Sequence, residues 1–166
     1  MAITSFTKVS LFLLCNAIFT LPMFTYASET TLERLEHHIN QHKGKVIYLD
    51  FWSSWCGPCR KSFPWMNKLQ QKYQEQGLTI LSVNLDHDRK LADKFLLDSP
   101  ADFPIIYDSK GLIARKYKLK GMPSSFIYDR TGKLVNAHVG FNKQKSQLYE
   151  QELAQLLNAK SQLEKP

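Results

Sequence analysis

A nearly unbroken apolar run over residues 45–52, with the sequence KVIYLDFW, limits the possible folds more than any other feature of the chain. Such a run is typical of a central β-strand that is covered on both faces. Residues 78–84, LTILSVN, form a second run of this kind. The stretch between the two runs has apolar residues at helical spacing, so the sequence predicts strands joined by a helix in an α/β domain.

The rest of the chain extends this alternation of helices and strands. Apolar spacing predicts helices over residues 31–41, 59–76, 90–97, 112–117 and 143–158, and further strands over residues 105–107, 124–128 and 133–139. The last two strands flank a turn and are expected to form a β-hairpin. Together these elements predict a central mixed β-sheet with helices on both faces. The residues expected to face the core from the third and last helices are Leu91, Phe95, Leu148, Leu153, Leu156 and Leu157.

The first 27 residues differ from the rest of the chain, because they carry one charged side chain, Lys8, ahead of an apolar stretch. Asn16 interrupts this stretch, and Thr25 and Ala27 are small residues at the two positions that a signal peptidase reads. We therefore expect residues 1–27 to be a signal peptide and residues 28–166 to form one domain. The alternative is an uncleaved anchor in the inner membrane, which normally needs about 20 apolar residues.

The composition indicates a globular protein with a basic surface. Hydrophobic residues make up 43% of the chain, which argues against a wholly disordered protein. The 22 Lys and Arg residues outnumber the 15 Asp and Glu residues, for a formal net charge of +7. Because the basic residues are spread along the chain without a dense run, we expect a solvated surface and no nucleic-acid partner.

Removal of the signal peptide would leave two cysteines, Cys56 and Cys59, in the sequence Cys-Gly-Pro-Cys. A disulfide between them closes a very short ring and restricts the unfolded chain little, so stabilisation explains the pair poorly and redox chemistry explains it better. The alternative is half of a zinc site, which needs two further ligands. His38 and His42 share a face of the first predicted helix, but we favour a solvated helix face and expect no metal or other cofactor.

Cys56 is expected to attack disulfides because it lies at the end of a strand and the start of a helix. A thiolate is the attacking species, and the unpaired N–H groups and dipole of a helix N-terminus favour its negative charge. Cys59 lies one turn into the helix and is expected to resolve the mixed disulfide. Pro58 suits the first helical turn, Gly57 leaves room for a partner chain, and Trp55 is expected to add an apolar contact surface.

The segment DFWSSWCGPC at residues 50–59 resembles the active-site segment of thioredoxins. Four further segments resemble exported thioredoxin-like reductases of the TlpA/ResA type: RKSFP at 60–64, VNLD at 83–86, FPIIYD at 103–108 and GMPSSFIYDRTG at 121–132. The resemblance covers nearly all of residues 28–166. It implies a thioredoxin fold in a single thioredoxin-like domain, and a thiol–disulfide oxidoreductase that works through a redox-active disulfide between Cys56 and Cys59.

The resemblance also implies how a substrate binds. In this family the proline that matches Pro123 is cis and faces the redox pair, and the backbone beside it, here Met122, pairs with an extended substrate segment. The sequence by itself shows only an X-Pro bond before a strand, and a proline at the entrance of a strand is the alternative interpretation.

Asp50 is an acid within an apolar strand, where it is costly unless it is paired, neutralised or used. Burial would raise its pKa. In thioredoxins the matching aspartate lies beneath the cysteines and helps to manage the proton of the resolving thiol, and the resemblance implies this role for Asp50. The alternative is an acid at the strand end that faces water.

Two departures from the TlpA/ResA pattern bear on the choice of partner. Ser62 stands where many of these chains carry an acidic residue, and residues 28–43 leave little room for the β-hairpin that often precedes their first helix. Any role of those two features in partner choice therefore does not transfer to this chain.

The Gly-Pro dipeptide between the cysteines resembles that of reducing thioredoxins, so we expect a reductant. The resemblance implies exported substrates with cysteine pairs in the bacterial periplasm, among them apocytochromes c, and a membrane thiol–disulfide protein as electron donor. The enzyme is expected to be a monomer. The alternatives are an oxidase or isomerase of secreted proteins, and a non-enzymatic module that binds metal or protein.

Overall fold

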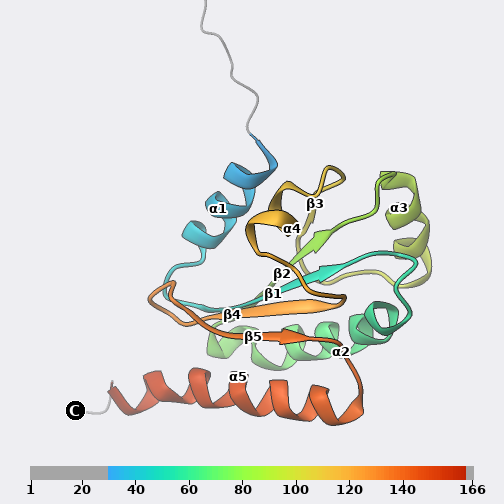
Figure 1. The fold of residues 1–166 in the computed structure, drawn as a ribbon. Helices are drawn as coiled ribbons and strands as arrows, with labels where there is room; N and C mark the ends of the chain where they lie inside the picture. The colour runs from blue at the N-terminus through green and yellow to red at the C-terminus, as the bar shows by residue number, and fades with distance from the viewer. Residues whose placement is uncertain (1–29, 164–166) are drawn as a thin grey trace, which may run out of the picture.

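The computed structural model describes residues 30–163, and their side chains up to residue 159, so the expected signal peptide lies outside the described residues (Figure 1). The elements are α1 (Thr31–Gln41), β1 (Val46–Trp52), α2 (Gly57–Tyr73), the 3₁₀ helix η1 (Gln74–Gln76), β2 (Leu78–Asn84), α3 (Arg89–Asp98), β3 (Ile105–Tyr107), α4 (Leu112–Lys116), β4 (Ser124–Tyr128), β5 (Leu134–Val139) and α5 (Lys143–Leu163). Every helix and strand predicted within residues 30–163 is present.

The five strands form one mixed sheet in the order β3-β2-β1-β4-β5. β2 is parallel to both β1 and β3, whereas β4 runs antiparallel to both β1 and β5. Along the chain, β2 and β3 are added on one side of β1, and β4 and β5 are then added on its other side. This reversal beside β1 is the place where open α/β sheets bind their ligands, at the carboxyl ends of the parallel strands.

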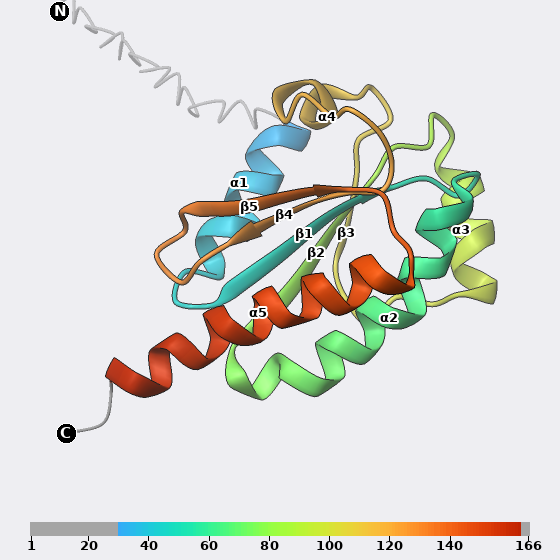
Figure 2. The same ribbon diagram turned by 60° about the horizontal axis from the view of Figure 1, so that its bottom comes forward.

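Helices cover both faces of the sheet, as the sequence predicts. α2 and α5 lie on one face, and α1 and α4 lie on the other (Figures 1 and 2). All seven residues of β1 are buried, and alternate residues enter two separate cores. Tyr48 and Trp52 pack with residues of α2 and α5, while Leu49 and Phe51 pack with residues of α1 and α4.

Local sequence signals fix where the first helix begins. The side chain of Thr30 accepts a hydrogen bond from the backbone of Glu33, and the Glu33 carboxylate accepts one from the backbone of Thr30. This reciprocal pair is a capping box, and it satisfies two N–H groups that the helix itself cannot.

Two expected core residues are exposed, so those predictions are wrong. Leu91 is 39% exposed, and Ala92 and Phe95 face the core from α3 instead. Leu148 is 50% exposed because Tyr149, Leu153 and Leu157 form the buried stripe of α5. In both helices the apolar residues outnumber the positions that one face offers, so spacing alone left the rotation of the helix open.

None of the helices within residues 30–163 combines the length and the apolar character needed to cross a membrane.

Leu153→Ala should lower the free energy of unfolding by about 2–5 kcal/mol, because it removes a fully buried side chain and leaves a cavity. Leu148→Ala is the matched control on the same helix, and it should change the free energy by less than about 0.5 kcal/mol. Urea unfolding followed by circular dichroism measures both values. Equal losses for the two variants would contradict the rotation of α5 described above.

Candidate active site

Three chain segments meet at the end of the sheet where the parallel strands terminate. The parallel strands β1 and β2 both end there, and the antiparallel strand β4 begins there, with Ser124 paired to Phe51. The Cys-Gly-Pro-Cys segment begins at Cys56, after a short loop that follows Trp52 at the end of β1, and Pro123 directly precedes β4. The topology therefore brings together two motifs that lie more than 60 residues apart in the sequence.

Cys56 and Cys59 form a disulfide with a Cα–Cα distance of 5.2 Å. Cys56 is the N-cap of α2, and its sulfur accepts a hydrogen bond of 3.3 Å from the backbone N–H of Cys59. Cys56 is 5% exposed, whereas Cys59 is fully buried. Gly57 and Pro58 are exposed and form the first positions of the helix. The N-terminus of α2 thus offers its free N–H groups to the outer sulfur, as the sequence predicts.

A buried carboxylate that sequence reasoning missed holds the loop before the cysteines. Asp86 accepts hydrogen bonds from the Ser54 backbone at 3.0 Å and from the Ser54 hydroxyl at 3.0 Å. Asn84 donates to the same carboxylate at 2.8 Å and accepts from the Asp86 backbone. Asp86 is buried two residues after the end of β2, so it fastens the loop that follows β1 to the loop that follows the neighbouring strand. The available signal was an acid close behind an apolar run, because a buried acid is costly unless it is paired.

The Met122–Pro123 peptide bond is cis, as the resemblance implies. Met122 packs against the core that contains both cysteines, and its sulfur accepts a hydrogen bond of 3.7 Å from the hydroxyl of Ser53. Within residues 30–163, no hydrogen bond reaches the backbone N–H or C=O of Met122. A backbone segment beside the redox pair is thus left unpaired.

Asp50 is buried in β1 between Tyr48 and Trp52, on the face of the sheet whose core includes both cysteines. Burial raises the pKa of Asp50 well above its ordinary value of 3.8. Its Oδ2 atom is buried without a hydrogen-bond partner in the described part of the chain. Asp50 therefore does not face water at a strand end, and it favours its neutral form.

Trp55 is a large exposed side chain next to the cysteines. It lines a shallow groove with residues of α2 and α3, among them Arg60, Leu91 and Lys94. Leu91, which the sequence predicts in the core, contributes to this groove instead. Apolar and basic side chains thus lie together beside the redox pair.

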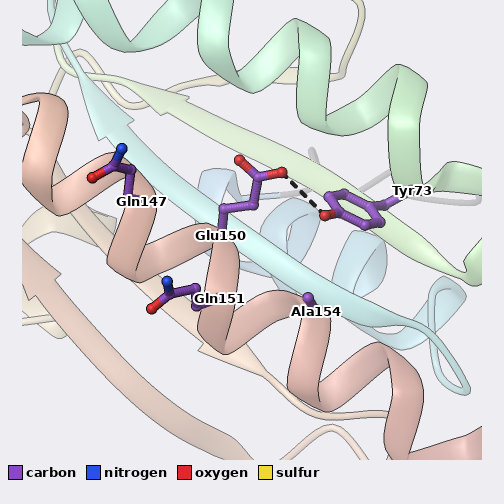
Figure 3. Close-up of a pocket in the computed structure, with 5 residues that line it drawn as sticks. All are labelled: Tyr73, Gln147, Glu150, Gln151 and Ala154. Atoms are coloured by element: carbon purple, nitrogen blue, oxygen red, sulfur yellow. Dashed lines mark hydrogen bonds between the residues drawn. The ribbon is translucent and has the colours of Figure 1, made fainter.

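The hollow drawn in Figure 3 lies elsewhere, between α2 and α5, and measures about 450 Å³. Glu150 accepts hydrogen bonds from Lys72 and Tyr73 at its wall, and neither cysteine lines it. We therefore do not connect this hollow with the redox chemistry.

The described residues, 30–163, contain no group of three or more His, Cys, Asp or Glu side chains that could hold a metal ion. His38 and His42 lie on α1, across the sheet from α2, which begins with the cysteine pair (Figure 1). His42 bonds to the backbone carbonyl of His38 instead. The arrangement gives no support to a zinc site shared by the two motifs.

Comparison with known proteins agrees with this geometry. Residues 19–157 match the redoxin family. The thiol–disulfide oxidoreductase ResA of Bacillus thuringiensis is 32% identical over 160 residues, which cover 87% of this chain and 92% of that protein. ResA of Geobacillus thermodenitrificans is 36% identical over 109 residues, which cover 66% of this chain and 63% of that protein.

Solved structures show the same fold. A Chlorobium tepidum protein assigned as the thiol:disulfide interchange protein DsbE is 48% identical, with a TM-score of 0.70 over 72% of this chain and 84% of that chain. StoA of Bacillus subtilis is 29% identical, with a TM-score of 0.56 over 65% of this chain and 82% of that chain. The chain therefore belongs to the redoxin family and is a thioredoxin-fold thiol–disulfide oxidoreductase of the ResA type.

Proposed function

We propose that this enzyme reduces disulfides of exported proteins, with Cys56 as the attacking residue and Cys59 as the resolving residue. The observation that carries the proposal is the unequal placement of the two sulfurs. Cys56 caps α2 and keeps some exposure, while Cys59 is fully buried behind it. An incoming disulfide can approach only the outer sulfur, which is also the one that the helix N-terminus stabilises as a thiolate.

The reaction transfers two electrons from the cysteine pair to the substrate. The Cys56 thiolate attacks one sulfur of the substrate disulfide, forms a mixed disulfide, and releases the other substrate sulfur as a thiolate that takes up a proton. Cys59 then loses its proton and attacks the Cys56 sulfur. The mixed disulfide breaks, the second substrate thiol leaves, and the enzyme holds the Cys56–Cys59 disulfide.

Asp50 is proposed to accept the proton of Cys59 during the second step. The carboxyl group lies on the cysteine side of the sheet, and burial raises its pKa well above its ordinary value, which makes it a better proton acceptor. An ordinary aspartate would remain ionised and would be a poor base for a thiol. Burial supports this role because it makes Asp50 a stronger base.

The surface around the pair supports binding of an extended peptide. The unpaired backbone of Met122, beside Pro123, is proposed to hydrogen-bond to the substrate chain, as β-strand addition does elsewhere. Trp55 would contact apolar substrate residues, while exposed Gly57 and Pro58 leave the approach to Cys56 open.

The proposed setting is the bacterial periplasm, reached by means of the signal peptide at residues 1–27. There a membrane thiol–disulfide protein would return electrons to the pair, and apocytochromes c are candidate substrates alongside other exported proteins with cysteine pairs. The enzyme would act as a monomer.

Asp50→Asn should make the oxidised protein more stable than the parent as pH rises above about 4. The folded parent holds a proton that the unfolded chain releases above pH 3.8, so its stability falls as pH rises through the raised pKa of Asp50. Urea midpoints at acidic, neutral and alkaline pH measure the trend. Asp98→Asn, which removes an exposed charge, is the control. A difference between parent and Asp50→Asn that stays constant with pH would contradict the raised pKa.

Cys59→Ser should capture partner proteins as mixed disulfides, whereas Cys56→Ser should capture few. Without Cys59 the first intermediate persists, because no second thiolate lies close enough to expel the partner. Non-reducing gels with mass spectrometry identify the adducts, which dithiothreitol should release. Equal capture by the two variants, or capture by Cys56→Ser alone, would reverse the assigned roles.

Protein recovered from the periplasm of a bacterial host should begin at Ser28. Intact-mass measurement decides this directly. A chain that still carried residues 11–21 and sedimented with membranes would replace the cleaved signal peptide with an anchor.

A further inference from the structure

A row of polar side chains crosses the sheet beneath α5. Asp50 on β1 pairs with Ser125 on β4, and Ser125 pairs with His138 on β5. Residues paired across strands point to the same face of a sheet, and this face is the one that α2 and α5 cover (Figure 2). Since β5 is the edge strand, the row leads from the middle of the sheet to its border.

The two ends of this row carry buried polar atoms without partners. Within the described residues, Asp50 Oδ2 and His138 Nδ1 make no hydrogen bond. Two strand spacings separate their backbones, about 10 Å in all. Ser125 is buried and lies in register between them, and its hydroxyl, which also interacts with the Tyr48 side chain, can both donate and accept a hydrogen bond.

The unpaired atoms are complementary in chemistry. His138 Nε2 lies 2.9 Å from Glu152 Oε2, and a carboxylate only accepts, so Nε2 carries the hydrogen. In a neutral imidazole the other nitrogen, Nδ1, is then a free base. Asp50 in its neutral form has an O–H to donate. Neutral Asp50, at one end of the row, thus lacks an acceptor for its O–H, and His138 Nδ1, at the other end, lacks a donor.

The side chain of His138 is also partly exposed to solvent. Its side chain is 12% exposed and that of Glu152 is 24% exposed. The ring stacks on Tyr149 of α5, with centroids 4.0 Å apart, and Asn136 donates to the same Glu152 carboxylate. These contacts hold the imidazole in place at the border between core and solvent.

We propose that His138 exchanges the proton of Asp50 with solvent, so that Asp50 is again a carboxylate when Cys59 must lose its proton. Asp50 gives a proton to the Ser125 hydroxyl, which gives its own proton to His138 Nδ1. The imidazolium, held by the Glu152 carboxylate, then releases one proton at the exposed edge. One proton leaves Asp50, one reaches solvent, and no electron moves. His138 acts on the reaction only through Asp50, so the inference rests on the proposed function.

Charged and titratable groups from each neighbouring element act on this pathway. Burial lowers the pKa of His138 below its ordinary value of 6.5, with Glu152 of α5 acting to raise it and Lys145 of α5 to lower it further. On β1, Tyr48 lies near Asp50, and burial, together with that acid, raises the pKa of Tyr48. Burial likewise raises the pKa of Tyr149, to which Glu152 and Asp50 add. Both tyrosines therefore stay neutral, and Asp50 and His138 are the groups of this row that can exchange a proton.

A double-mutant cycle with Asp50→Asn and His138→Asn tests the inference. Rapid quenching with an alkylating agent, read by mass spectrometry, follows the decay of the mixed disulfide that the reduced enzyme forms with a saturating disulfide peptide between about pH 5 and pH 9. His138→Asn should slow reduction at neutral pH by about tenfold and remove the acidic limb of the pH profile. In the Asp50→Asn background it should change the rate less than about twofold. Val135→Ala, which shortens an exposed side chain on the same strand, should leave the profile unchanged.

Glu152→Gln gives a second test that leaves the buried ring in place. Loss of the carboxylate should move the acidic limb to lower pH, because Glu152 raises the pKa of His138. An equal loss from His138→Asn in both backgrounds would overturn the inference and leave His138 a structural role. A slow Asp50→Asn enzyme beside an unaffected His138→Asn enzyme would also overturn it, with the proposed function intact. An Asp50→Asn enzyme as fast as the parent would overturn the inference together with the role proposed for Asp50, and would leave the assignment of Cys56 and Cys59 intact.

Discussion

The redox site depends on β1, which is buried on both faces. This buried strand also contains a carboxyl group, Asp50. β1 fills two cores with alternate side chains, so its position is fixed by packing from both sides. The rigid strand delivers Cys56 to the start of α2 and keeps Asp50 on the cysteine side of the sheet. Burial thus sets the place of the redox pair and also changes the chemistry of the acid beneath it.

Asp86 is a second buried acid at the same end of the sheet, and it has a structural role. Asp86 is fully satisfied by Ser54 and Asn84, whereas Asp50 has an oxygen without a partner in the described residues. A satisfied carboxylate is suited to hold a loop, and an unsatisfied one is suited to exchange a proton. The number of hydrogen bonds therefore separates the structural acid from the acid proposed to take part in the reaction.

Much of this fold could be predicted from the sequence, because the buried runs and the Cys-Gly-Pro-Cys segment are strong local signals. The rotation of helices was harder, and Leu91 and Leu148 were assigned to the core although they are exposed. The polar row could not be predicted from the sequence, because only strand register brings Asp50, Ser125 and His138 together. His138 has no nearby motif, and its partner Glu152 belongs to the following helix. Such tertiary pairings leave no periodic trace in the sequence.

The reduction potential of the Cys56–Cys59 pair tests the central claim most directly. A reductant of the thioredoxin kind has a potential near about −270 mV, whereas a strong oxidase of the DsbA kind lies near about −120 mV. Within the described residues one donor, the Cys59 backbone N–H, reaches the Cys56 sulfur, whereas a strong oxidant needs a much more stabilised thiolate. Equilibration with dithiothreitol redox buffers, read by alkylation and mass spectrometry, should therefore give a value near that of thioredoxin. A value near that of DsbA would contradict the account and identify the enzyme as an oxidase.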